Sequence, residues 1–201
     1  MRSWKSSGSA AAVHAMAEIG TDHRVAVHVS GSIAAVKACE VITSLRKRGC
    51  EVRVAMTAGA QRFITPIALQ SLSGNPVLTD VWHEGSAGHA MGHIELGAWA
   101  QVHVAVAGSA NLIARLAHGF ADDAVTTVLL ATRAPLLLAP AMETAMWTHA
   151  ATCANVEVLR ARGVHFIGPV SGRLASGASG DGRMADVSAV VEETMATLAA
   201  S

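Results

Sequence analysis

Charged and aromatic side chains are scarce in this chain. Only 15% of its 201 residues are charged and 3% are aromatic, with no tyrosine, whereas soluble domains carry roughly 25% charged residues. The 15 basic and 15 acidic residues cancel, which argues against a nucleic-acid or anionic-membrane partner held by bulk electrostatics. No apolar run reaches the roughly 20 residues that span a bilayer. We therefore expect a cytoplasmic protein, and because 51% of its residues are hydrophobic, part of its surface should be an interface between copies.

Cysteine is also rare. Cys39, Cys50 and Cys153 are odd in number, widely spaced and outside any CxxC pattern. This distribution argues against a disulfide framework and against a cysteine-based zinc site. We expect three small and mostly buried side chains.

The length of the chain suits one compact α/β domain with a hydrophobic core. Residues 1–22 are rich in serine and alanine and lack a leucine-rich stretch, so we expect a flexible N-terminal leader there. Residues 23–201 contain neither an internal repeat nor a linker, and we assign them to a single domain.

From residue 24 onward, short β-branched runs alternate with helical stretches. The runs predict buried strands at 25–29, 51–56, 102–106, 135–139 and 164–167. The stretches between and after them predict helices at 33–48, 59–72, from 110, 140–160 and 187–200. Nearly continuous apolar strands that alternate with helices are typical of a parallel sheet covered on both faces. We therefore predict a single-domain Rossmann-like (flavodoxin-like) α/β fold, an open parallel sheet with helices on both faces.

Small, hydroxylated or amide residues follow three of these strands, at 30–32, 57–59 and 108–111. Each turn precedes a helix whose first N–H groups are unpaired and carry partial positive charge, which suits a phosphate. These turns match neither the GxGxxG pattern nor the P-loop pattern, so a dinucleotide or P-loop nucleotide is not indicated. Each turn alone is explained by ordinary N-capping through serine or threonine. Three turns at one sheet edge favour a phosphorylated cofactor.

A group of histidines raises the question of a metal site. His83, His89, His93 and Glu95 lie close in sequence, but HExxH is absent and the spacing does not suit a closed zinc site. We therefore predict no metal. His93 directly precedes an apolar stretch and is better interpreted as a fixed general base or as a helix-capping residue.

Two further segments carry unusual residues. Residues 140–147 follow a buried strand, and their Met146 and Trp147 are explained by packing as well as by function. The loop at 171–184 is rich in glycine and serine, as an ordinary connection would be. Because Leu174, Arg183 and Met184 do not suit a mere linker, a lid over a site is the alternative.

Together these motifs resemble the flavin-dependent cysteine decarboxylases. This homo-oligomeric family includes phosphopantothenoylcysteine decarboxylase and the peptidyl-cysteine decarboxylases of lantibiotic-type peptides. The resemblance covers about residues 24–186. Its motifs stand here as Gly31-Ser-Ile-Ala34, Thr57 with Phe63, His93-Ile-Glu-Leu96 with Trp99, Ser109-Ala-Asn111, Ala121-Asp-Asp123, Pro140-Ala-Met-Glu-Thr-Ala-Met-Trp147 and Gly180-Asp-Gly-Arg-Met184.

The resemblance implies an FMN cofactor, His93 as the catalytic histidine and a substrate clamp at 171–184. It also implies trimers, or dodecamers built from trimers, with the flavin near the subunit boundary. The positions implied for the cofactor are Gly31, Ser32, Ile33, Thr57, Gly59, Ser109, Ala110, Asn111 and Ala141. Those implied for the substrate are Glu143, Met146, Trp147, Leu174, Ser176, Arg183 and Met184.

Flavin chemistry suits the decarboxylation of a cysteine. Oxidation of the carbon that bears sulfur gives a thioaldehyde, which accepts the electron pair as CO2 leaves and becomes an enethiolate. The thiol, with an ordinary pKa of about 8.5, must first lose its proton, and a neutral histidine can assist that loss.

The chain departs from the family pattern at two positions. Ser176 stands where the phosphopantothenoylcysteine enzymes carry a cysteine that helps to reduce the enethiol, and Glu143 stands where the family has asparagine. An ionised Glu143 would repel a substrate carboxylate, so it must be protonated, turned away or used for a different substrate contact. These departures favour oxidative decarboxylation of the C-terminal cysteine of a ribosomally made precursor peptide, giving an aminoenethiol. The alternatives are phosphopantothenoylcysteine decarboxylation in coenzyme A biosynthesis, or a non-catalytic flavin-binding regulatory subunit.

Overall fold

The central feature of the molecule is a parallel sheet of six strands. A computed structural model describes residues 23–82 and 92–200. In the sheet order β3-β2-β1-β4-β5-β6, neighbouring strands run parallel throughout. The strands are β1 (His23–Val29), β2 (Cys50–Met56), β3 (Val77–Leu78), β4 (Val102–Gly108), β5 (Leu136–Pro140) and β6 (His165–Phe166). The predicted fold class is therefore confirmed.

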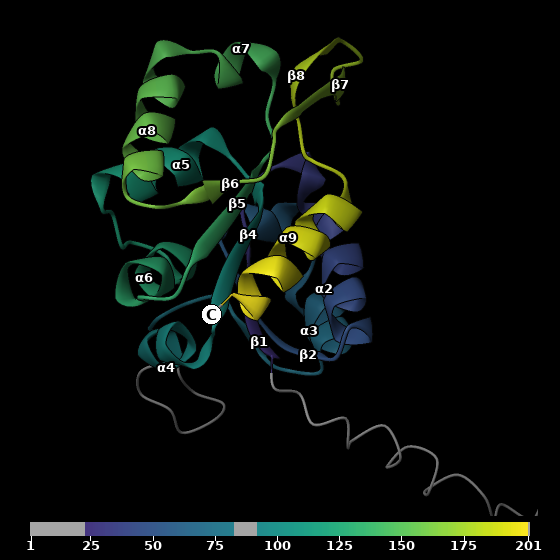
Figure 1. Cartoon of the computed structure of the whole chain (residues 1–201), viewed down its shortest axis with the longest axis vertical. Helices are drawn as coiled ribbons and strands as arrows, with labels where there is room; N and C mark the ends of the chain where they lie inside the picture. Colours follow the sequence, from purple (N-terminus) through teal and green to yellow (C-terminus); the bar gives the residue numbers. More distant parts are fainter. Residues whose placement is uncertain (1–22, 83–91, 201) are drawn as a thin grey trace, which may run out of the picture.

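Helices cover both faces of this sheet (Figure 1). One face packs against α2 (Ala38–Lys47), α3 (Pro66–Ser73) and α9 (Val187–Ala199). The other face packs against α4 (Gly92–Trp99), α5 (Ala110–His118), α6 (Ala124–Ala131) and α8 (Ala150–Ala161). Because both faces are covered, successive residues of a strand enter different cores: Val25 and Val27 lie in the first core, whereas Ala26 lies in the second.

Several predicted helices are shorter than the sequence pattern indicated. The segment 33–48 begins as the 3-10 helix η1 (Ile33–Lys37) and continues as α2. The segment 59–72 contains a 3-10 turn, η2 (Ala60–Arg62), and α3 begins only at Pro66. Thr65 is extended there because a residue before proline disfavours the helical conformation.

The segment 140–160 is likewise interrupted. Residues after β5 run extended to Glu143, a short helix α7 (Thr144–Trp147) follows, and α8 begins after His149. The His149 side chain accepts a hydrogen bond from the Ala151 N–H and so caps the start of α8. This extended stretch keeps residues 141–143 at the carboxyl edge of the sheet.

The segment predicted as a glycine- and serine-rich loop is instead a hairpin. Strands β7 (Val170–Arg173) and β8 (Ser179–Arg183) pair antiparallel, and the Leu174 N–H donates to the Ala178 carbonyl across the turn at 2.8 Å. The hairpin lies directly against residues 142–144 (Figure 1). A Cβ at Gly182 would overlap the Met142 carbonyl oxygen, so this close approach requires glycine.

The predictions about the cysteines, a membrane span, the leader and the number of domains have different outcomes. Cys50 is buried and Cys39 partly so, but Cys153 is exposed on α8, so the expectation of burial was wrong for that residue. Within the described ranges, no helix is long and apolar enough to cross a membrane. The predicted leader at 1–22 lies outside the described residues, and the assignment of one domain stays a prediction.

Candidate functional site

Two pockets lie side by side where the strands of the sheet end. The first, here called the strand-end pocket, has a volume of about 460 Å³. Its lining comes from the three predicted turns together with the start of α5: Ser30, Gly31, Thr57, Ala58, Gly59, Ser109, Ala110, Asn111, Leu112, Arg115, Asp122, Asp123 and Met146. The parallel strands therefore bring residues that are far apart in sequence to one edge, as the sequence pattern predicted.

The backbone forms the floor of the strand-end pocket. A Cβ at Gly31 would lie 3.1 Å from the Gly59 Cα, so the turns after β1 and β2 almost touch. Glycine at both positions leaves the amide groups of two turns open to a ligand, which is the arrangement that a phosphate uses. We call the space between the Gly31 and Gly59 turns the cradle. Larger side chains at these two positions would fill the cradle, so its shape supports a bound anion at this point.

Hydroxyl groups complete the turns. Ser109 Oγ accepts a hydrogen bond from the Leu112 N–H at 3.2 Å and caps α5. Thr57 Oγ1 accepts from the Ala60 N–H at 3.1 Å. The capping role proposed as the alternative is therefore present, and it fixes the hydroxyls at the rim of the pocket.

Ser30 ties the first turn to the third. Its hydroxyl donates to the Ala107 carbonyl at 2.7 Å and accepts from the Ser109 N–H at 3.0 Å. Ala107 adopts a positive φ of 59° where β4 bulges against β5. A left-handed alanine costs conformational energy, so this network holds the third turn in a strained form beside the pocket.

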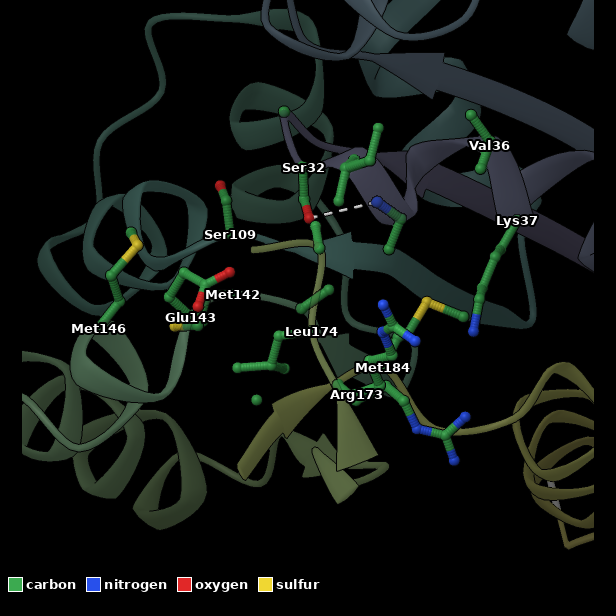
Figure 2. A pocket seen from close by; sticks show the side chains of 17 residues that line it. Ser32, Val36, Lys37, Ser109, Met142, Glu143, Met146, Arg173, Leu174 and Met184 are labelled. Carbon is green, nitrogen blue, oxygen red and sulfur yellow. Dashed lines mark hydrogen bonds between the residues drawn. The ribbon is translucent and has the colours of Figure 1, made fainter. Parts of the chain in front are cut away.

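The second pocket, here called the hairpin pocket, has a volume of about 490 Å³ and lies beneath the β7–β8 hairpin. Figure 2 shows side chains from η1, the 141–146 segment and the hairpin around it. Apolar groups such as Ile33, Met142, Leu174 and Met184 form most of the wall. The two pockets share Gly31, Ser109 and Met146, so a ligand in one would contact a ligand in the other.

The two departures from the family pattern are in direct contact. Ser176 Oγ donates to Glu143 Oε2 at 2.9 Å, which joins the turn of the hairpin to the segment before α7. Glu143 also lines the hairpin pocket, where Figure 2 shows its carboxylate near Met146. The carboxylate therefore holds the hairpin, a role that the sequence did not suggest.

Most of the predicted site residues are brought together in these two pockets. Of the predicted cofactor positions, Thr57, Gly59, Ala110 and Asn111 line the strand-end pocket, Ser32, Ile33 and Ala141 line the hairpin pocket, and Gly31 and Ser109 line both. Of the predicted substrate positions, Glu143, Met146, Leu174, Arg183 and Met184 line the hairpin pocket. Ser176 reaches it through Glu143, whereas Trp147 lines neither pocket and packs against the second core.

His93 lies elsewhere in the chain. It occupies the first turn of α4, which sits at the end of the sheet opposite α7 and the hairpin (Figure 1). Its Nδ1 atom is buried and has no hydrogen-bond partner among the described residues. A single copy of the chain therefore does not bring His93 to either pocket. His83 and His89 lie outside the described residues, and the absence of a metal stays a prediction.

Sequence reasoning missed three charged residues of these pockets, Lys37, Arg173 and Arg115. Lys37 ends η1 and lines the hairpin pocket together with Arg173 of β7. Arg115 lines the strand-end pocket and pairs with Asp122 and, at 3.5 Å, with Asp123. Lys37 lies one helical turn after Ile33, a spacing that the sequence does show. Arg173 became visible only once the loop proved to be a hairpin.

A buried pair of histidines supports the strands beneath these turns. His28 on β1 and His103 on β4 are both 0% exposed, with 2.8 Å between His28 Nε2 and His103 Nδ1. Their other ring nitrogens have no partner among the described residues. Burial, with the neighbouring His103, holds the pKa of His28 well below its usual value, and burial lowers the pKa of His103 to about 4. Both rings are therefore neutral at physiological pH.

Comparison with known families gives one matching model. The model is described as Flavoprotein and matches residues 15–199, which is nearly the whole chain. The predicted flavin is thereby confirmed, and similar solved structures that are named for their cofactor are named for FMN.

Curated relatives share long stretches of sequence with the chain. The coenzyme A biosynthesis bifunctional protein CoaBC of Escherichia coli K12 is 48% identical over 173 residues, covering 86% of this chain and 42% of the relative. The CoaBC protein of Mycolicibacterium smegmatis is 45% identical over 161 residues, covering 80% of this chain and 38% of the relative. The chain therefore spans about two fifths of the length of the curated relatives it matches.

Solved structures agree with the fold. A cysteine-to-serine mutant of PPC decarboxylase, complexed with pantothenoylaminoethenethiol, matches with a TM-score of 0.78 and 32% identity, covering 87% of this chain and 97% of the other. The FMN-dependent cysteine decarboxylase SpaF matches with a TM-score of 0.75 and 33% identity, covering 88% and 98%. The FMN-binding protein AtHal3 matches with a TM-score of 0.78 and 30% identity, covering 89% of this chain and 97% of the other.

Proposed function

Because the chain belongs to the Flavoprotein family, we propose that it is an FMN-dependent decarboxylase of phosphopantothenoylcysteine in coenzyme A biosynthesis. The observation that carries this proposal is the shared wall of the two pockets. Gly31, Ser109 and Met146 line both, so a substrate in the hairpin pocket would lie against a flavin in the strand-end pocket. Relatives named CoaBC and PPC decarboxylase indicate the substrate class.

The peptide substrate favoured by the sequence is corrected. Relatives at 42–48% identity are named as coenzyme A biosynthesis proteins, and none of those cited is a peptide-modifying enzyme. The expectation of a precursor peptide was wrong because it rested on two side chains, Ser176 and Glu143. These side chains bond to each other, and their departure has a structural reason that does not require a different substrate.

The strand-end pocket fits FMN through the chemistry of its donors. The Gly31 and Gly59 turns and the N-terminus of α5 offer backbone N–H groups for the phosphate, with the Thr57 and Ser109 hydroxyls at the rim. Arg115 neutralises the two nearby aspartates, which would otherwise repel an anion. When bound, FMN would supply an acceptor and donor of two electrons for the oxidation and reduction of the substrate.

The residues of the hairpin pocket hold the substrate and exclude water. Met142, Leu174 and Met184 cover the pantothenoyl chain with apolar surface, while the hairpin closes over it. Glu143 is held by Ser176, which fixes the hairpin in the closed position. In this arrangement the cysteine end of the substrate would lie toward the wall shared with the flavin.

His93 acts on this site from a second copy of the chain. Its unpartnered Nδ1 suits a proton acceptor for the substrate thiol, but α4 lies at the far end of the sheet within its own copy. A homo-oligomer, as the sequence predicts, would bring α4 of one copy to the pockets of another. Exposed apolar side chains beside the hairpin pocket, Ile33 at 55% and Val36 at 50%, suit such an interface.

The test uses the purified protein loaded with FMN. Incubated with phosphopantothenoylcysteine, it should release a product that has lost CO2 alone, as measured by mass spectrometry. The absence of this product, together with turnover of a cysteine-terminated peptide, would contradict the proposal. Loss of CO2 and of two further hydrogens from phosphopantothenoylcysteine would show that the enethiol is released without reduction.

The role of a second copy has its own test. The His93→Asn and Gly31→Val variants should each be inactive alone. Mixed under conditions where subunits exchange, they should regain part of the activity, because some sites combine an intact His93 with an intact cradle. A mixture that stays inactive despite exchange, seen by mass spectrometry of the intact oligomers, would contradict the shared site.

A further inference from the structure

We propose that Lys37, Arg173 and Arg183 form the subsite for the phosphate end of the substrate, an inference that rests on the proposed function. All three line the hairpin pocket, from η1, β7 and β8. Glu143 is the acidic residue of the same lining, so cations outnumber it. A surplus of positive charge in a partly enclosed pocket attracts an anion such as a phosphate, which carries nearly two negative charges at pH 7.

Two of the cations, Lys37 and Arg173, occupy one side of the pocket. In Figure 2, Lys37 and Arg173 lie on the same side, and Glu143 lies on the opposite side beside Ser109 and Met146. Ser109 and Met146 belong to the wall shared with the strand-end pocket. The two ends of the pocket therefore differ in charge. The reacting end of the substrate would lie at the shared wall, and its phosphate end would lie at the cations.

The cations are available for a ligand. Neither Lys37 nor Arg173 has a carboxylate within ion-pair distance among the residues that the structure describes. Arg183 forms an ion pair with Asp186 at 3.3 Å, but its Nε atom is buried without a partner in the described ranges. A buried N–H that no protein group accepts is free to donate a hydrogen bond to a ligand oxygen.

Gly172 fixes the position of Arg183. A Cβ at residue 172 would lie 2.8 Å from Arg183 Nε, so the side chain of Arg183 passes directly across β7. Arg173 is the next residue of that strand. The hairpin thus contributes two guanidinium groups to the lining of the pocket. A guanidinium group binds phosphate through paired hydrogen bonds. The part of the pocket between the cations and the shared wall is apolar and suits an extended, uncharged chain.

The phosphate of FMN is the other source of the same chemistry, and the test separates the two. The FMN-loaded protein is titrated calorimetrically with 4′-phosphopantetheine and with pantetheine, which differ only in the phosphate. We expect the wild type to bind the phosphorylated ligand at least about tenfold more tightly, with a preference that shrinks as ionic strength rises. Lys37→Met and Arg173→Gln should each reduce this preference several-fold and leave pantetheine binding unchanged.

Matched controls keep the result specific. Lys47→Met and Arg133→Gln remove the same charges from exposed sites outside both pockets and should leave the preference unchanged. The affinities for FMN and for riboflavin are measured in every variant. If Lys37→Met and Arg173→Gln weaken FMN binding selectively and preserve the preference for 4′-phosphopantetheine, the cations hold the cofactor and the inference is overturned.

Two further outcomes separate this inference from the proposed function. Equal wild-type affinity for the two ligands, with turnover of phosphopantothenoylcysteine intact, would overturn the phosphate subsite alone. Failure of the wild type to bind either ligand, together with absence of turnover, would overturn the proposed function and this subsite with it.

Discussion

The two pockets recognise their ligands by different means. The strand-end pocket is made by backbone turns whose positions follow from the parallel sheet, with Gly31 and Gly59 almost in contact. The hairpin pocket is made by side chains, on a hairpin that is held to the rest of the molecule by a few contacts such as Ser176–Glu143. Substitutions at the first should therefore affect the cofactor strongly, whereas substitutions at the second should affect the substrate and leave the cofactor in place.

The largest effect is expected from closing the cradle. In Gly31→Val the new side chain would meet the Gly59 backbone, which cannot move away because the Gly59 turn is anchored to β2. We expect FMN binding to weaken by roughly 100-fold or more, because backbone donors to the phosphate are displaced. Flavin fluorescence during titration measures this affinity.

A glycine outside the pockets serves as the control for that variant. A Cβ at Gly97 on α4 would meet the neighbouring atoms at 3.4 Å or more, an ordinary contact distance. Gly97→Ala should therefore bind FMN like the wild type. Normal FMN affinity in Gly31→Val would show that the cradle does not hold the cofactor.

The buried histidine pair predicts loss of stability in acid. The folded-state pKa values of His28 and His103 lie below their unfolded values, so the unfolded chain binds more protons. Stability is therefore fully present above about pH 6.5 and falls as the pH is lowered toward about 4, by roughly 3 kcal/mol from His103 alone. Urea unfolding at a series of pH values measures this slope.

A double variant isolates the pair from other titrating groups. His28→Leu with His103→Leu removes both imidazoles and keeps the buried volume similar. Its unfolding free energy should depend less on pH between 6.5 and 4 than that of the wild type. An unchanged pH dependence would show that the pair does not cause the acid sensitivity.

A third substitution detaches the hairpin and tests the independence of the two pockets. Gly182 has a φ of 137° and faces the Met142 carbonyl, so Gly182→Ala should displace β8. We expect the KM for phosphopantothenoylcysteine to rise about tenfold, and FMN affinity to stay the same, because the strand-end pocket has no lining from the hairpin. Parallel loss of FMN would show that the pockets form a single unit.

The smallest effect is expected from the contact between the two unusual residues. Ser176→Ala removes one exposed hydrogen bond, worth about 1 kcal/mol, and should raise the KM several-fold with little change in FMN affinity. Ser179→Ala, on the same hairpin but without a side-chain hydrogen bond among the described residues, is the matched control. Steady-state kinetics measures the KM of both variants. Equal KM values would show that the Ser176–Glu143 hydrogen bond does not contribute to substrate binding.

The sequence predicted the strand-end pocket well because strand ends carry a local signal. Gly31, Thr57 and Ser109 each follow a β-branched run, and a parallel sheet places such ends at one edge. The hairpin pocket was harder to predict. The glycine-rich composition at 171–184 indicated a loop, and only the pairing of β7 with β8 shows how Arg173 comes to line the same pocket as Arg183 and Lys37.

Other features depended on contacts that sequence alone does not give. The pairing of His28 with His103 depends on the register between β1 and β4 across 75 positions of sequence. The contact between Ser176 and Glu143 depends on how the hairpin lies against the segment before α7. The helix α6 was missed although Asp123 and Thr126 form a capping box that is visible in the sequence. The catalytic role implied for His93 stays a prediction, since α4 lies at the end of the sheet opposite the hairpin within one copy.

The most direct test is the release of CO2 from phosphopantothenoylcysteine by protein that has been stripped of flavin and then reloaded. The account predicts that the flavin-free protein releases no CO2, that added FMN restores release, and that FMN fails to restore it in Gly31→Val. Undiminished release from the flavin-free protein would contradict the claim that the strand-end pocket holds the group that makes decarboxylation possible.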